Sequence, residues 1–290
     1  MHLERVEFSD FRNFRSLSLT PASSLNILTG PNAQGKTNLL EGIGFLLAGR
    51  SFRGAKAAAL PSWEAAGAVV TGHLRRRDAE RPLQRAVSRR EDGAWVVTGE
   101  RCPWARVIAF GWHDLGIVTD GPHARRSFLD NFAGKLYPAH LTALSRYRQI
   151  LARRNHLLQR GLDPAALSGR LGPWNEQLVR VGLELIGRRR SAAAVLAGEA
   201  ARLYPQLAGN GQVHLEYLGA LGPEPTEAKF REALEGQLSE EMRRGQTLSG
   251  PHRDDLLIEV DGRDLRVFGS RGQQRLMALA LRLAEADPVT

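Results

Sequence analysis

Cysteine and long apolar runs are almost absent from this sequence. The 290 residues include one cysteine, Cys102, so no disulfide can form within the chain and no zinc site can be built on cysteine ligands, as expected in a reducing compartment. The longest apolar run, around Gly42 to Gly49, is far shorter than the roughly 18 residues that a membrane span requires. Residues 1–8, MHLERVEF, lack the basic and apolar regions of a signal peptide. We therefore expect a cytoplasmic protein with no membrane association.

Acidic residues are also in deficit. Lys and Arg number 40 against 31 Asp and Glu, and the formal net charge of +9 suits a polyanionic partner such as nucleic acid or an acidic lipid surface. With 42% hydrophobic and 24% charged residues, the composition is that of an ordinary globular protein. A disordered or collagen-like chain is excluded, and the length allows one large domain or two ordinary ones.

The N-terminal part alternates short strands with turns before one helix. Apolar runs within residues 3–8, 17–19 and 25–28 predict three strands, the last of which ends at Gly30. From Leu39 onwards apolar residues recur at spacings of three and four, which predicts a helix with one apolar face. Further strands are predicted at residues 68–71, 84–88, 95–98 and 107–110.

The rest of the chain is mainly helical. The predicted elements are helices at 141–158 and 174–203, a strand at 213–217, two strands at 256–260 and 265–268 joined by the hairpin turn Asp261-Gly262, and a final helix at 272–286. A helical insertion within an α/β domain explains this order best.

A phosphate-binding loop lies between the third strand and the first helix. Its residues match G-x-x-x-x-G-K-[ST] at every fixed position and are Gly30, Pro31, Asn32, Ala33, Gln34, Gly35, Lys36 and Thr37. The glycines let backbone N–H groups turn toward an anion, and the helix that follows points its positive end at the same place. Lys36 would reach the β- and γ-phosphates and the Thr37 hydroxyl would bind Mg²⁺. This predicts a nucleotide site. No Asn-Lys-x-Asp element for guanine occurs, which argues against a GTPase, and a small-molecule kinase remains an alternative.

A second helix start carries a similar signal. Ser270 followed by Gln273 is a capping-box pattern, which is sufficient to explain both residues as a helix cap. Together with Gly272, however, they form a Ser-x-Gly-Gln element that resembles the signature motif of ATP-binding-cassette ATPases. In that class the signature of one subunit closes over the γ-phosphate held by the partner.

Five sequence blocks together resemble the RecF family. They are FRNFR at 11–15, GPNAQGKTN at 30–38, PHARRSFLDNF at 122–132, SGPHRDDL at 249–256 and FGSRGQQRLMALALRLAEA at 268–286. The resemblance implies an α/β P-loop head of the ABC and SMC type, with a β-rich ATP-binding lobe (1–120), an inserted helical lobe (121–245) and a hairpin with the signature helix (246–290).

The function implied by this resemblance is ATP-dependent recombination mediation. Family members bind DNA at single-strand gaps and stalled forks, dimerise across ATP, and load recombinase with RecO and RecR. Carried onto this chain, residues 30–37 hold ATP and Mg²⁺, whereas Ser270, Gly272 and Gln273 meet the ATP of the other subunit. Arg12 and Asn13 match a position near the nucleotide. An alternative is a DNA-structural clamp that uses ATP only to hold a dimer together.

The catalytic acids of such ATPases have no counterpart here. After Ala286 there is no apolar run followed by two acidic residues, which is the pattern of a Walker B strand. A carboxylate normally holds Mg²⁺ and positions water. We therefore expect these residues to bind ATP poorly and to hydrolyse it negligibly, and a longer form to be a slow ATPase.

Charged clusters outside the motifs leave two questions open. Arginines gather at 75–77 with 85, 89 and 90, at 146–154 and at 188–190, and either form solvated faces or contact DNA phosphate. Asp254 and Asp255 follow His252, so the three residues could be read as a metal site. Because neighbouring residues of a strand point to opposite faces, we expect instead that the two aspartates are polar residues of the surface and of the hairpin.

Overall fold

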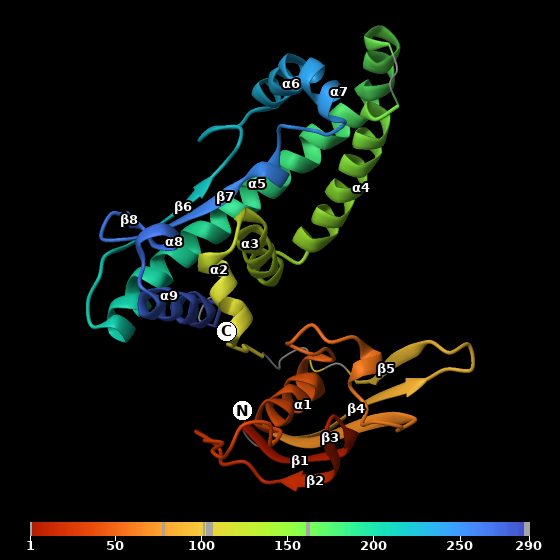
Figure 1. The fold of residues 1–290 in the computed structure, drawn as a ribbon, viewed down its shortest axis with the longest axis vertical. Helices are drawn as coiled ribbons and strands as arrows, with labels where there is room; N and C mark the ends of the chain where they lie inside the picture. Colours follow the sequence, from red (N-terminus) through yellow and green to blue (C-terminus); the bar gives the residue numbers. More distant parts are fainter. Residues whose placement is uncertain (1, 77–78, 101, 103–106, 161–162, 287–290) are drawn as a thin grey trace. The chain divides into compact units, whose positions relative to one another are not determined.

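The computed structural model describes residues 2–76, 79–100, 102, 107–160 and 163–286 (Figure 1). The chain divides into two compact units, one ending at Ala109 and the other beginning at Phe110. The three-part division at residues 120 and 245 stays a prediction. No helix within the described ranges combines the length and the apolarity that crossing a membrane demands.

The first unit is an antiparallel sheet covered by one helix (Figure 1). Its strands lie in the order β2-β1-β3-β4-β5. The elements are β1 (His2–Phe11), β2 (Phe14–Leu19), α1 (Lys36–Ala48), the 3-10 turn η1 (Ala57–Ala59), β3 (Gly67–Arg76), β4 (Ala79–Arg89) and β5 (Trp95–Gly99). Buried phenylalanines from β1 and α1, Phe8, Phe11 and Phe45, form the centre of the core. A Cβ at Gly42 would lie 2.2 Å from a Phe8 ring carbon, so glycine is what lets α1 approach β1 this closely.

Two strands predicted in this part of the sequence are wrong. Residues 25–29 have no regular structure, and Leu25 and Ile27 are 74% and 75% exposed. Residues 107–110 are likewise irregular, with Phe110 46% exposed. The apolar runs fit strands, but no described strand lies beside either segment, and a strand without a hydrogen-bonding neighbour is not formed.

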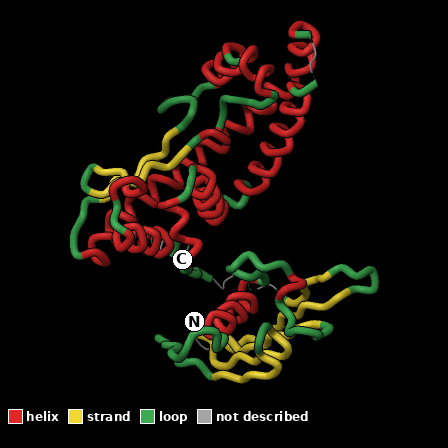
Figure 2. Tube along the Cα trace, viewed as in Figure 1, coloured by secondary structure: helices red, strands yellow, loops and turns green. Residues whose placement is uncertain are grey.

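The second unit is built on one long helix and a small sheet (Figure 2). Its antiparallel strands are β6 (Val213–Leu218), β7 (Asp255–Val260) and β8 (Arg263–Asp264), in that order. The α-helices are α2 (Gly116–Thr119), α3 (Pro122–Leu136), α4 (His140–Leu158), α5 (Pro164–Ala208), α6 (Glu227–Gly236), α7 (Leu238–Arg244), α8 (Leu265–Phe268) and α9 (Arg271–Ala284). The 3-10 turns are η2 (Trp112–Leu115) and η3 (Pro251–Arg253).

Helix α5 contributes to three apolar clusters in turn. Leu167 and Leu171 pack with the end of α4, Leu178 and Leu185 pack with Tyr147 and Phe230, and residues 192–204 pack with α3, α9 and the sheet. Buried residues recur at spacings of three and four along the helix, which gives it one continuous apolar stripe.

The third strand predicted wrongly lies just before the last helix. Residues 265–268 form the single helical turn α8, because the Asp264 side chain accepts a hydrogen bond from Arg266 N at 2.8 Å and begins a helix there. Helices α4, α5 and α9, strands β6 and β7 and the turn at Asp261-Gly262 confirm the other predictions for this unit.

Candidate nucleotide site and a buried arginine network

The phosphate loop folds by placing three residues in the left-handed region of the backbone. Gly30, Ala33 and Gly35 have φ of 138°, 65° and 97°, and two of these positions are glycine, which pays no Cβ penalty there. Helix α1 begins at Lys36 with no side-chain cap and no acidic residue in its first turn. Its first N–H groups and the positive end of its dipole are therefore available to an anion.

Lys36 and Thr37 lie where the loop meets α1. Lys36 Nζ donates to Gly30 O at 2.6 Å and to Pro31 O at 2.5 Å, so its ammonium group is folded over the loop. Thr37 is exposed, as are residues 31–34 of the loop. This arrangement fits a phosphate group and its Mg²⁺, because it combines a cation folded over the loop, uncapped N–H groups at the start of α1 and an exposed hydroxyl beside them.

Arg12 and Asn13 form the two-residue turn between β1 and β2, where Arg12 has a φ of 56°. Asn13 packs against the phosphate loop: its amide accepts a hydrogen bond from Asn38 Nδ2 at 2.8 Å, and a Cβ at Gly35 would lie 2.5 Å from Asn13 Nδ2. Arg12 instead donates to Glu41 through Nε at 2.9 Å and Nη2 at 2.7 Å. Of the two predicted residues, Asn13 therefore lies against the loop, whereas the Arg12 guanidinium is engaged by a carboxylate of α1.

Glu41 is the acid of helix α1, and it is fully buried. Ser51 Oγ donates to it at 2.5 Å, and Arg53 lies 3.4 Å away. Burial alone would raise the pKa of Glu41, but the hydrogen bonds from Arg12 and Ser51 outweigh burial and lower it. Glu41 is thus an ionised structural anchor and is not free to bind a metal ion.

The predicted signature residues surround the start of α9 in the second unit. Ser270 Oγ accepts from Gln273 N at 3.2 Å, and Gln273 Oε1 accepts from Ser270 N at 2.8 Å, which completes a capping box. Ser270, Gly272 and Gln273 are nevertheless exposed, and a Cβ at Gly272 would meet only Ser270 Oγ, at 3.9 Å. The cap and an open surface for a ligand coexist here.

The expectation that the arginine runs are either solvated faces or DNA contacts is wrong for three of their members. Arg85, Arg154 and Arg189 are 7%, 0% and 3% exposed. Arg85 donates to the carbonyls of Leu46 and Gly99. These side chains hold the structure together instead of meeting solvent.

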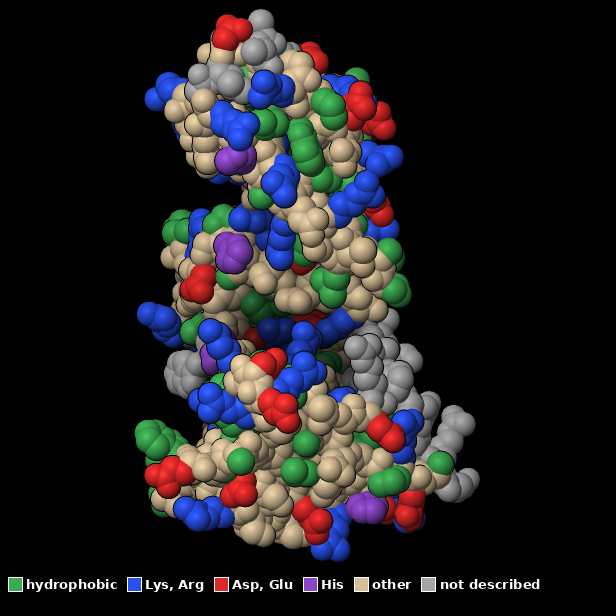
Figure 3. Space-filling model, turned by 90° about the vertical axis from the view of Figure 1, so that its right-hand side faces the viewer, with side chains coloured by type: hydrophobic (Ala, Val, Ile, Leu, Met, Phe, Trp, Pro, Cys, Tyr) green, Lys and Arg blue, Asp and Glu red, His purple; other side chains and the backbone are tan. Residues whose placement is uncertain are grey.

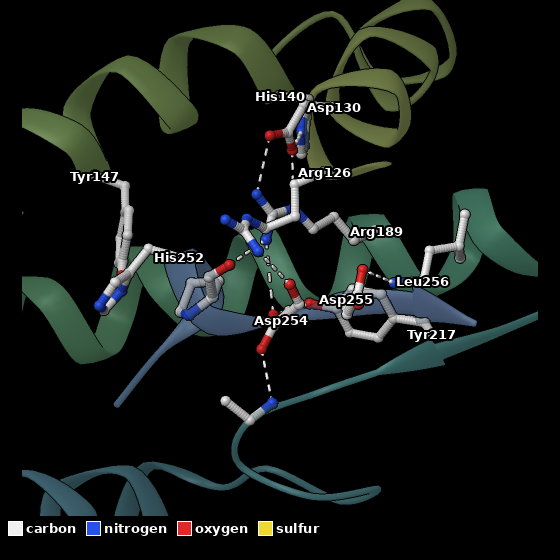
Figure 4. A network of polar contacts seen from close by, with 12 residues as sticks. Arg126, Asp130, His140, Tyr147, Arg189, Tyr217, His252, Asp254, Asp255 and Leu256 are labelled. Carbon is white, nitrogen blue, oxygen red and sulfur yellow. Dashed lines mark hydrogen bonds and ion pairs between the residues drawn. The ribbon is translucent and has the colours of Figure 1, made fainter. Parts of the chain in front are cut away.

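Arg189 is at the centre of a buried network in the second unit (Figure 4). It donates to both oxygens of Asp130, from Nε at 2.8 Å and from Nη2 at 2.9 Å, and its Nη1 donates to Pro251 O at 2.5 Å. His140 Nε2 lies 2.9 Å from the same carboxylate. Burial raises the pKa of Asp130, but the hydrogen bonds from His140 and Arg189 prevail and lower it.

Arg154 forms a second buried node between α4, α5 and α7. It donates to Glu241 at 2.7 Å, to Thr247 Oγ1 at 2.8 Å and to Asn175 Oδ1 at 2.8 Å. Arg154 and Glu241 are both fully buried, so the pair is sustained by these hydrogen bonds on every side.

Asp254 is not the surface residue that the sequence predicted, whereas the Asp255 side chain is 28% exposed. Asp254 is 1% exposed and accepts hydrogen bonds from the Tyr217 hydroxyl and, at 2.7 Å, from Ala220 N. Burial raises the pKa of Asp254 against these hydrogen bonds. Asp255 binds Arg125 through both carboxylate oxygens, at 2.7 and 2.9 Å. Within the described residues no group of three or more His, Cys, Asp or Glu is placed to hold a metal ion.

Sequence reasoning missed these arginine–carboxylate pairs, although two of the blocks that it singled out contain some of their members. PHARRSFLDNF provides Arg125, Arg126 and Asp130, and SGPHRDDL provides Asp254 and Asp255. The paired residues are 59 to 130 positions apart in the chain, so no local spacing signals them. The presence of both basic and acidic residues within these blocks was the signal in the sequence that could have indicated buried ion pairs.

Known proteins resemble this chain over nearly its whole length. The DNA replication and repair protein RecF of Desulforudis audaxviator is 37% identical in an alignment covering 98% of this chain and 81% of that protein. The protein of the same description from Heliobacterium modesticaldum is 35% identical, covering 98% and 80%. A sequence family described as an AAA domain matches residues 5–80.

Solved structures agree with the sequence relatives. A structure described as the recombination mediator protein RecF-ATP in the RecFOR pathway superposes with a TM-score of 0.79 at 27% identity, over 98% of this chain and 80% of that one. An Smc head domain from Pyrococcus furiosus superposes with a TM-score of 0.51 at 17% identity, over 98% and 78%, which shows the shared ATPase-head fold. The predicted α/β P-loop head is confirmed. With over a third of its residues identical to RecF of D. audaxviator across almost its full length, the chain belongs to the RecF family of DNA replication and repair proteins.

Proposed function

We propose that this chain binds Mg²⁺-ATP at residues 30–37 and acts as an ATP-dependent recombination mediator in DNA repair. The observation that carries the proposal is the formed phosphate loop, in which Lys36 is folded over the loop and α1 begins directly beneath it. Lys36 binds the β- and γ-phosphates, Thr37 is the metal ligand, and the loop N–H groups bind the remaining phosphate oxygens. The RecF-ATP structure of a relative supports the choice of ATP.

The test is ATP affinity measured by calorimetry with Mg²⁺ present. Lys36→Ala should weaken binding by about a hundredfold or more, which corresponds to about 2.7 kcal/mol at 25 °C. Lys56→Ala is the matched control, because Lys56 is an exposed lysine of the same unit that lies outside the loop. Equal affinities of the two variants would overturn the assignment of the site.

Dimerisation across ATP is the second part of the proposal. Ser270, Gly272 and Gln273 are exposed around an anion-ready helix start, and they would meet the γ-phosphate bound by another copy of the chain. Ser270→Asn separates the two roles of Ser270, because Asn also caps helices but lacks the hydroxyl and is larger. We expect this variant to keep the stability of the chain and to lose the ATP-dependent dimer in sedimentation velocity. A dimer unchanged by the substitution would exclude the signature role.

The proposed partners are DNA at single-strand gaps and stalled forks, with RecO and RecR. The net charge of +9 supports a polyanionic partner, and the family supports DNA over lipid. Fluorescence anisotropy with gapped, forked and blunt duplexes tests the DNA preference. Co-sedimentation with purified RecO and RecR, with and without ATP, tests the assembly.

A DNA-structural clamp that uses ATP only to hold its dimer together is the second candidate. Release from DNA at equal rates with ATP and with a non-hydrolysable analogue would support the clamp. Faster release with ATP would support the mediator that turns over ATP.

A further inference from the structure

A cavity of about 260 Å³ opens between α3, α4, α5 and the turn η3 of the second unit. Polar and basic side chains line much of it: His123, Arg126 and Ser127 from α3, Arg148 from α4, Arg189 from α5, and His252 from η3. Apolar residues of α4, among them Leu144 and Leu151, complete the wall. None of these residues belongs to the phosphate loop or the signature.

We call the part of the lining formed by Asp130, Tyr147, Arg189 and His252 the inner wall. The polar side-chain atoms of these residues already have hydrogen-bond partners. Both oxygens of Asp130, the carboxylate of the lining, are held by Arg189. His252 Nε2 donates to Thr247 O at 3.0 Å, and its Nδ1 accepts from the Tyr147 hydroxyl at 2.8 Å. Burial, with the positive charges of Arg253 and Arg126 nearby, lowers the pKa of His252 to about 4, so its ring is neutral at physiological pH. The inner wall therefore offers no free acceptor to a cation.

We call the part of the lining formed by His123, Arg126, Ser127 and Arg148 the outer wall. It carries hydrogen-bond donors that have no partner among the described residues. Arg126 donates through Nη1 to Asp254 O at 2.6 Å, which leaves Nε and Nη2 unused among the described residues. Within that same part of the chain, the side chains of His123, Ser127 and Arg148 have no hydrogen bond or ion pair. Burial and the charge of Arg189 lower the pKa of Arg126, which means that more negative charge would stabilise this guanidinium. The cavity is thus rich in donors and short of anionic acceptors.

We propose that this cavity binds one phosphate group of a DNA backbone, held by Arg126 and Arg148 with Ser127 and His123 as further donors. Two guanidinium groups beside a hydroxyl match the tetrahedral oxygens of a phosphate, and guanidinium is the side chain best suited to bidentate contact with it. The inference rests on the proposed DNA binding and names a contact for it. The proposal gives the exposed Arg148 a DNA-binding role, whereas the buried Arg154 of the same run has a structural role.

The surroundings of the opening favour a strand of DNA over a free nucleotide. Arg148 is exposed on α4, and Arg146 and Arg153 are exposed arginines of the same helix for which the described residues provide no ion pair. On the upper part of the face in Figure 3, which belongs to the second unit, Lys and Arg side chains recur with histidine among them. A backbone with a phosphate at every nucleotide can meet the cavity and these neighbours together, whereas a free nucleotide cannot.

The test compares Arg148→Glu with Arg146→Glu in DNA-binding anisotropy. Both residues are exposed on α4, and each variant changes the charge equally, but two residues of helix turn Arg146 about 200° away from Arg148. We expect Arg148→Glu to weaken duplex binding about tenfold and to reduce the slope of log affinity against log salt by roughly 0.9, the value for one phosphate. Arg146→Glu should cost less than about threefold. Equal losses would overturn the proposal.

Inorganic phosphate distinguishes the source of the ligand and separates this proposal from the proposed function. In a Lys36→Ala background, which weakens the phosphate loop, phosphate should raise Tm above that in chloride at equal ionic strength, and Arg148→Glu should abolish the rise. If this rise occurs while wild-type chain binds no DNA, the proposed DNA binding fails and the cavity is a site for a free phosphate. If DNA binds equally to wild type and Arg148→Glu, DNA binding survives and the cavity contact is excluded.

Arg126→Gln provides a second variant at the outer wall. Gln removes the charge and is too short to keep the hydrogen bond to Asp254 O, so we expect weaker DNA binding together with a small fall in Tm from that one lost bond. Unchanged DNA affinity would count against the role of Arg126 in the cavity.

Discussion

The phosphate loop of the first unit and the arginine network of the second unit use cationic side chains in opposite ways. Lys36 lies at the end of an exposed loop, and its ammonium group donates to carbonyl oxygens within six residues of it. A ligand can therefore replace these carbonyls as the partner of the ammonium group. Arg189 and Arg154 are buried and bind carboxylates 59 and 87 residues away. The comparison shows that charge prepared for a ligand is held locally and exposed, whereas charge that stabilises the fold is matched inside by distant residues.

The largest expected effect is the loss of Asp130. Asp130→Ala leaves Arg189 buried without the carboxylate that accepts its hydrogen bonds, and with the Asp254 carboxylate 3.6 Å away, which should lower the free energy of unfolding by about 3–5 kcal/mol. Urea unfolding measures it. The double variant Asp130→Ala with Arg189→Met should recover most of the loss, because it removes both buried charges. A loss below about 1 kcal/mol for Asp130→Ala would show that the network is no more costly to break than a surface pair.

The next effect is a pH dependence from His252. Its pKa is lowered from 6.5 to about 4, so between these values the unfolded chain binds a proton that the folded chain does not. Stability is therefore present above about pH 6.5 and is lost as the pH falls toward 4, by up to about 3 kcal/mol. The lowered pKa of Asp130 adds a further loss below its unfolded value.

His252→Gln should flatten the dependence between pH 6.5 and 4, whatever it does to the stability at neutral pH. His214→Gln is the control, since His214 is 57% exposed and should leave the slope unchanged. Denaturant unfolding at a series of pH values gives the slope for each variant. The same slope in wild type and His252→Gln would show that another group is responsible.

A smaller effect on stability is expected at Ser270. This residue combines properties of the buried network and of the exposed loop, because its side chain caps α9 and is also exposed. Ser270→Ala should cost about 1 kcal/mol of stability through the lost cap, whereas Ser270→Gly should cost only a few tenths. Thermal unfolding of the two variants measures the difference. Equal stabilities would mean that the capping box contributes nothing.

The smallest effect on stability is expected at Lys36. Lys36→Ala should change the free energy of unfolding by less than about 0.5 kcal/mol, because its partners are loop carbonyls that water can also reach. Urea unfolding of this variant beside Asp130→Ala tests the comparison directly. A loss of several kcal/mol would show that Lys36 is part of the stabilising framework.

The elements that could be predicted from the sequence are those whose signals are local. The loop at 30–37 is specified by its glycines and the helix that follows, and the capping box at Ser270 by residues three apart. The spacing of apolar residues at intervals of three and four predicts helices α4 and α5. In each case the determining contacts lie within a few residues of one another.

The features that could not be predicted depend on distant partners. Residues 25–29 have the composition of a strand, but whether a strand forms depends on a neighbour elsewhere in the chain. Asp254 follows a pattern typical of surface residues, and only the folded structure places Tyr217 and Arg189 around it. Arg148 and Arg154 belong to one run of basic residues, and helix rotation alone sends one outward and the other into the core.

Helix α5 also has a mechanical consequence. Its 45 residues rise roughly 68 Å, and it joins the cluster around α9 at one end to the cluster around α7 at the other. If it tilts as one rod, a rotation of about 5° at the α9 end displaces the far end by roughly 6 Å. A tilt of that size would be large enough to measure between two labels placed at the ends of α5.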